Sequence, residues 1–118
     1  MRAPRDRSQE LQRIAQRKRA ATAQVGQAFL RLLHLAEAHE SGQARRIAAF
    51  LASTFDGQAF GLDPFMLREV DAAIADDMLA CLDALRWAQT EWHSLVPQGQ
   101  QRVLAVIERH GLKWPDAS

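Results

Sequence analysis

The sequence contains little cysteine and no long apolar run. Among its 118 residues there is a single cysteine, Cys81. One thiol cannot form a disulfide within the chain or build a thiol-based zinc site, so both cross-links common in small secreted domains are excluded. The longest apolar run, Ile47 to Ala52, has six residues, whereas a membrane-spanning helix needs about 18. The first twenty residues hold no apolar segment of the signal-peptide type. We therefore expect an unanchored cytoplasmic protein that is stabilised by packing.

The sequence also lacks the spacings of known catalytic and metal sites. His34 and His39 lie five residues apart, about 140° around a helix, so their imidazoles would not converge on one metal ion. The glycine-containing loop 56–63 has neither the alternating acidic ligands of a calcium loop nor a phosphate-binding GxxxxGK[ST] motif. Nothing beside Cys81 lowers a thiol pKa. We predict no catalytic residue, no metal site and no cofactor, and we predict that the protein is not an enzyme.

Helical periodicity, by contrast, runs through most of the chain. Hydrophobic residues make up 47% and charged residues 25% of the sequence, as in an ordinary globular domain. Apolar residues recur three or four positions apart, and this spacing predicts helices over residues 8–40, 43–55, 64 to about 92, and 98–110. No segment alternates with a period of two for long enough to form a strand.

Several residues predict where these helices begin and end. Ser41 is a predicted N-cap, and Asp63 followed by Pro64 marks a second helix start. Gly111 after the last helix indicates a Schellman-type ending. Asp76 and Asp77 suit the first turn of a helix, where carboxylates meet the positive end of the macrodipole. They therefore predict a split or kink of the third helix near Ala75.

These elements predict an all-α fold, an antiparallel bundle of four to five helices with a long N-terminal helix. A helix over residues 8–40 would be about 50 Å long, whereas a compact chain of this size is about 35 Å across. Part of the first helix must therefore project. We divide the chain into a basic arm (1–22), a helical bundle (23–112) with Cys81 in its core, and a tail (113–118).

Charge is distributed unevenly between the arm and the rest. Residues 1–20 hold seven basic and two acidic side chains, a net charge of +5, whereas the other 98 hold eight basic and twelve acidic, a net charge of −4. Arg13 and Arg17 lie one helical turn apart with Lys18 and Arg19 beside them, a spacing that could follow a phosphate backbone. The alternatives are a solvated arm and an arm that folds back on the acidic body.

Three apolar residues are candidates for protein contacts. Leu11 and Ile14, continued by Lys18, follow the heptad spacing of a helix seam and could pair with a second copy. Trp114 follows the last predicted helix and, if exposed, could anchor a partner. The alternative interpretation is that the tryptophans of the chain complete the bundle core.

Two segments resemble a known family. They are AAFLASTFDGQAFGLDPFMLREVDAAIADDMLACLDALRW, residues 48–87, and LVPQGQQRVLAVIERHGL, residues 95–112. The chain resembles short uncharacterised proteins, a domain of unknown function, carried on integrative elements and plasmids of proteobacteria. The likeness covers about residues 28–112. It implies a mainly α fold and an accessory cytoplasmic role in a mobile element, and it assigns no catalytic residue.

We therefore expect a non-enzymatic helical interaction protein that binds a protein partner or its own copy, with Leu11, Ile14 and Trp114 as candidate contacts. The alternative hypothesis is a nucleic-acid-binding accessory factor that uses Arg13, Arg17, Lys18 and Arg19 of the arm.

Overall fold

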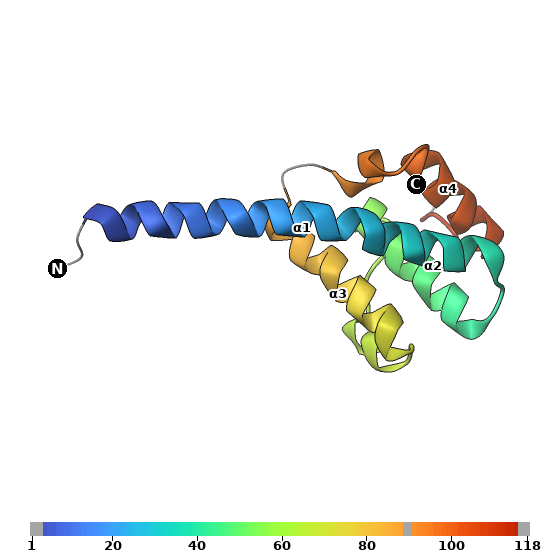
Figure 1. The fold of residues 1–118 in the computed structure, drawn as a ribbon. Coiled ribbons are helices and arrows are strands. Elements are labelled where there is room, and N and C mark those ends of the chain that lie inside the picture. The colour runs from blue at the N-terminus through green and yellow to red at the C-terminus, as the bar shows by residue number, and fades with distance from the viewer. Residues whose placement is uncertain (1–3, 89–90, 116–118) are drawn as a thin grey trace.

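The computed structural model describes residues 4–88 and 91–115, and these residues form four α-helices, two short 3-10 helices and no strand. The elements in chain order are α1 (Pro4–Ala38), α2 (Gly42–Phe55), η1 (Pro64–Arg68), α3 (Ala72–Trp87), η2 (Trp92–Leu95) and α4 (Gly99–Arg109). The predicted all-α helical bundle is confirmed (Figure 1).

Helix α1 dominates the shape of the molecule. It runs through Gly26 without a break for 35 residues, and the molecule reaches 56 Å along its longest axis. No side chain of residues 7–20 is buried, and that of the next residue, Ala21, is buried. The part of α1 before Arg17 therefore stands away from the other helices, as the length argument predicts (Figure 1).

The core lies where α1 packs against α2 and α3, and where α4 packs against α2. Burial of apolar side chains here supplies the main stabilising free energy, about 1.5–3 kcal/mol for each large one. Cys81 is fully buried in this core, as predicted. The largest fully buried side chains are those of Phe29, Phe50, Leu32, Leu33, Ile47, Leu51, Met78 and Ile107.

The predicted caps of α2 and α4 are confirmed. The hydroxyl of Ser41 accepts a hydrogen bond from the Ala44 N–H at 3.1 Å. Helix α4 ends in a Schellman motif, in which the N–H of Leu112 donates to the carbonyl of Ile107 at 3.0 Å. Gly111 takes the required left-handed conformation, with φ at 68°.

The third predicted helix is split, but not at the predicted place. Asp63 accepts a hydrogen bond from the Phe65 N–H, as expected of a cap, yet it opens only the short helix η1. Asp71, not Asp76 or Asp77, precedes the first residue of α3. The reason is a tertiary contact: Asp71 exchanges two hydrogen bonds with the Gln43 side chain of α2, of 2.7 and 3.2 Å.

The third helix also ends earlier than predicted, at Trp87 rather than near Trp92. Residues 89–90 of the predicted helix lie outside the described residues. Trp92 belongs to η2, which brings its side chain and that of His93 into the interior. A continuous helix could not turn these side chains back onto α1 and α4, which both contact η2.

Of the predicted arm and tail, residues 1–3 and 116–118 lie outside the described residues. Within the described residues, no helix has both the length and the apolar character needed to cross a membrane.

Candidate functional site

The projecting part of α1 carries an apolar pair between two cations. Arg7, Leu11, Ile14 and Lys18 follow one another at intervals of four, three and four residues, so they share one face of the helix. Side chains of Leu11 and Ile14 are 61% and 36% exposed. The same spacing continues to Ala21 and into the core, so the arm extends the buried stripe of α1 beyond its covering helices. We call these four residues the arm stripe.

The four predicted phosphate-binding residues do not form one surface. Each residue turns an α-helix by about 100°, which places Arg19 about 120° from Arg13 and about 160° from Arg17. Only Arg13 and Arg17 point to the same side. Arg17 is also engaged with the body of the protein, because its guanidinium carbon lies 5.0 Å from the centre of the Trp87 ring.

Trp87 links the arm to the end of α3. Arg86 lies over the same indole, also 5.0 Å from its centre. Cation–π contacts of this kind contribute about 0.5–1 kcal/mol at exposed sites. The base of the arm is thus held against the body at Arg17, while residues before it extend outward.

Trp114, the third predicted contact residue, is 44% exposed. Its ring lies edge-on to Phe60, with centres 4.7 Å apart, and to Phe55, with centres 6.4 Å apart. Trp114 therefore packs on the end of α2 and the loop after it, not on the projecting part of α1. The structure therefore brings Leu11 and Ile14 together but leaves Trp114 on a separate surface.

Two of the three aspartates of helix α3 form ion pairs, and the third, Asp76, is exposed. Asp77 forms a bidentate ion pair with Arg31 of α1, at 2.8 and 3.0 Å. Asp83 accepts from Arg86 of its own helix at 3.2 Å. Asp76 is exposed, and with Asp83 it brackets Leu79, whose side chain is 50% exposed.

Buried polar groups near the end of α3 are the feature that sequence patterns missed. Within the described residues, three buried side-chain nitrogens have no hydrogen-bond partner: Nε1 of Trp87, Nε1 of Trp92 and Nε2 of His93. Each group of this kind costs about 1–3 kcal/mol. No spacing in the sequence predicts them, because α2, α3 and η2 must first meet.

His93 is 6% exposed and is surrounded by rings, with Phe29 and Phe55 edge-on at 5.2 and 5.6 Å. Burial lowers the pKa of His93, since a charged imidazolium is poorly solvated there. The Glu91 carboxylate, 3.8 Å from Nδ1, works in the opposite direction. His93 is therefore mainly neutral at pH 7.

The pocket beside His93 has a volume of about 310 Å³. Neither Cys81 nor Asp83 lines it, so these two residues and His93 do not share one pocket. Burial raises the pKa of the Cys81 thiol to about 12, so the thiolate is scarcely populated at neutral pH. Among the described residues, no three side chains of histidine, cysteine, aspartate or glutamate are grouped to hold a metal ion.

Comparison with known proteins identifies the family to which the chain belongs. The sequence model of a family of unknown function, DUF7673, matches residues 26–111. No curated protein and no solved structure matches the chain. The matched range starts within α1 and runs to the Schellman glycine of α4. Because it covers most of the sequence, the chain belongs to DUF7673, a family of unknown function.

Proposed function

We propose that the protein is a non-enzymatic helical interaction protein that binds another helix through the arm stripe. The observation that carries this proposal is the exposure of Leu11 and Ile14, 61% and 36%, on a helix that is already folded and already projects. A preformed helix loses little conformational entropy on binding, which favours helix-to-helix recognition.

The charges of the arm stripe define its partner. Arg7 and Lys18 bracket the apolar pair, so the complementary helix presents apolar residues bracketed by carboxylates. Two arms side by side would bring like charges together, since each carries a net charge of +5 over residues 1–20. The arm is therefore a poor partner for another arm.

Helix α3 of a second copy offers the complementary pattern. Leu79 is half-exposed on α3, between Asp76 and Asp83 at intervals of three and four residues, although Asp83 also pairs with Arg86. The body as a whole is acidic, with a net charge of −4 outside residues 1–20. We infer that the arm of one copy binds the outer face of α3 in another.

Light scattering on the full-length chain, from about 10 to 500 μM, tests this proposal. We expect a concentration-dependent dimer that Leu11→Gln/Ile14→Gln abolishes without changing the helical content. The matched control, Gln12→Ala/Gln16→Ala, alters the opposite side of the same helix and should leave the dimer intact.

Charge reversal makes the test specific. Arg7→Glu/Lys18→Glu and Asp76→Lys/Asp83→Lys should each be monomeric, whereas mixing them should restore a one-to-one complex. A wild-type protein that stays monomeric over the whole range, or a mixture that forms no complex, would contradict binding between copies.

Nucleic-acid binding through Arg13, Arg17, Lys18 and Arg19 is the second candidate, favoured by the exposure and net charge of the arm. Anisotropy of labelled duplex and single-stranded DNA at about 50 and 200 mM salt tests it, since affinity falls with each phosphate neutralised. Two contacts, from Arg13 and Arg17, predict about a tenfold loss for duplex DNA; four predict a loss above a hundredfold. A Gln substitution at all four positions should remove binding, and equal affinity for that variant would contradict this function.

The cellular setting is also a proposal. The resemblance of residues 28–112 to proteins of proteobacterial integrative elements and plasmids supports an accessory role in the cytoplasm of a bacterium that carries such an element. Transcription of the gene for this protein together with mobile-element genes would support this setting.

A further inference from the structure

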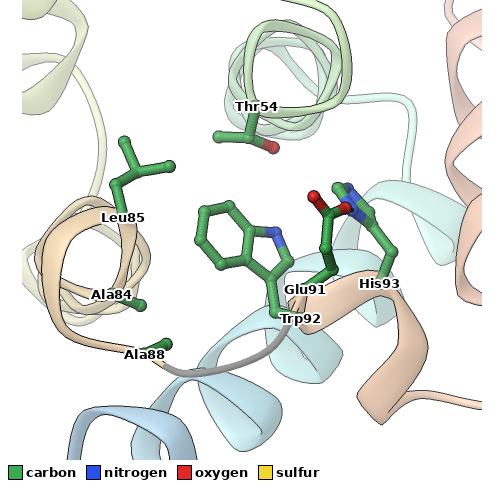
Figure 2. Close-up of a pocket in the computed structure, with 7 residues that line it drawn as sticks. All are labelled: Thr54, Ala84, Leu85, Ala88, Glu91, Trp92 and His93. Carbon is green, nitrogen blue, oxygen red and sulfur yellow. Dashed lines mark ion pairs between the residues drawn. The ribbon is translucent and has the colours of Figure 1, made fainter. Parts of the chain in front are cut away.

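The pocket between α2, the end of α3 and η2 brings unpartnered polar groups together with apolar side chains. It has a volume of about 310 Å³, within the range of small-molecule sites. One side of it is apolar, and the other carries three polar residues and the Trp92 indole (Figure 2). The lining residues are Thr54, Ala84, Leu85, Ala88, Glu91, Trp92 and His93.

The polar side contains both unused donors and unused acceptors. The Trp92 indole is 6% exposed, and its N–H, which can only donate, has no partner. Figure 2 shows that nitrogen turned toward the space between Thr54 and the Glu91–His93 pair. The Thr54 hydroxyl donates to the Leu51 carbonyl at 2.8 Å, which leaves its oxygen able to accept.

Glu91 and His93 complete this arrangement. The Glu91 carboxylate can only accept, and its side chain is 82% exposed at the pocket rim. Nε2 of His93 is buried and has no partner, although the ring is fixed between Phe29 and Phe55. Two of the three unpartnered buried nitrogens among the described residues therefore belong to residues that line one pocket.

We propose that this pocket binds a small molecule with an uncharged primary amide and a short branched aliphatic tail. The amide oxygen accepts from the Trp92 N–H, and the amide NH₂ donates to Thr54 and Glu91. The tail lies against Ala84, Leu85 and Ala88. This site is separate from the arm stripe and does not depend on the proposed function.

The donor and acceptor pattern selects the amide over its charged analogues. A carboxylate of the same shape offers only acceptors and would meet the Glu91 carboxylate. An ammonium offers only donors and would leave the buried Trp92 N–H unpaired. A buried polar group left without its partner on binding reduces affinity by about tenfold or more.

Titration of the ¹⁵N-labelled full-length protein with isovaleramide, isovalerate and isoamylamine tests the proposal. The chain has three tryptophans, hence three indole N–H signals, and Trp87→Phe and Trp114→Phe identify the Trp92 signal by elimination. We expect isovaleramide to shift the Trp92 signal with an affinity about tenfold better than either analogue. The signal of Trp114, which does not line the pocket, should not move.

Thr54→Val removes the acceptor while keeping the shape of the side chain, and it should weaken isovaleramide binding about tenfold. Ser53→Ala is the matched control, because Ser53 makes the same kind of hydrogen bond, to Phe50, but does not line the pocket. No shift up to about 50 mM, as expected if only water completes the site, would overturn the proposal. So would a preference for isovalerate or isoamylamine, or unchanged affinity in Thr54→Val.

Discussion

Arg102 of α4 and Glu37 of α1 form a bidentate ion pair, with nitrogen-to-oxygen distances of 2.7 and 2.8 Å. The two residues are 65 positions apart in sequence. Both side chains are at least two-thirds buried, with exposures of 23% and 33%. The pair fixes the last helix of the bundle against the first, next to the point where the His110 ring contacts the Ala36 carbonyl at 2.8 Å.

Glu37→Gln should lower the free energy of unfolding by about 1 kcal/mol, because it weakens two charge-assisted hydrogen bonds that are only partly screened by water. Hydrogen bonds from Arg102 lower the pKa of Glu37. The stabilisation is therefore present above the ordinary glutamate pKa and is lost as pH falls through the lower, folded-state pKa. Urea unfolding at neutral pH and below about pH 4.5 measures both effects.

Glu40→Gln is the control for this prediction. Glu40 pairs with Arg109 at 3.4 Å, but its side chain is 79% exposed. Its loss should change stability by less than about 0.5 kcal/mol. Equal effects of the two substitutions would show that burial does not strengthen the Glu37 pair.

His93 should make the protein less stable in mild acid. Its folded-state pKa is lowered by burial, so the unfolded chain binds more protons than the folded chain below about pH 6.5. Stability is then full above that pH and falls as pH drops toward the lower pKa. His93→Phe should flatten the change in melting temperature between about pH 7.5 and 5.5, a window above the one in which Glu37 acts. An unaltered slope would show that His93 does not titrate in this range.

Two glycines should respond to alanine in opposite directions. Gly26 lies within α1, and an added Cβ would meet Leu95 at an ordinary 3.7 Å, so Gly26→Ala should stabilise the protein by about 0.5–1 kcal/mol. At Gly99 the Cβ would overlap the His93 carbonyl oxygen, a backbone atom. Gly99→Ala should cost about 3 kcal/mol.

Gly61→Ala is the control for steric overlap, since nothing lies within 4 Å of a Cβ built there. Thermal melting of the three variants measures the order. A stabilising Gly99→Ala or a strongly destabilising Gly26→Ala would contradict the packing around η2.

Cys81 should be inert in the folded protein. It is fully buried, and its pKa is raised to about 12 by loss of solvation, reinforced by the charge of Asp77. A disulfide reagent such as DTNB should therefore react no faster than the protein unfolds, and completely in denaturant. Rapid reaction under native conditions would mean that the helix carrying Cys81 opens locally.

Local chemistry is what made much of the fold predictable. Ser41 and Gly111 act through hydrogen bonds and dihedral angles within a few residues, so their positions in the sequence suffice. The buried position of Cys81 followed from its place in a helical stripe. The start of α3 after Asp71 could not be predicted in this way, because it depends on Gln43, which is 28 residues away from Asp71.

The candidate sites divide in the same way. In the sequence, Leu11 and Ile14 form an apolar pair with too few apolar neighbours to make a buried helix face, and the structure leaves both exposed. The combination of Thr54, Trp92 and His93 in one pocket was not visible, because it requires α2, α3 and η2 to meet. Likewise, the contact of Arg17 with Trp87 exists only because α3 ends beside the base of the arm.

The sequence by itself determined that this protein is helical, where most helices begin and end, and that α1 is too long for the body it enters. Hydrophobic periodicity, capping groups and the fixed rise of a helix act over short distances along the chain. Tertiary structure alone decided where the third helix divides, which polar groups are buried without partners, and which arm cations stay clear of the body. Those outcomes depend on contacts between residues far apart in sequence, whose geometry no local pattern encodes.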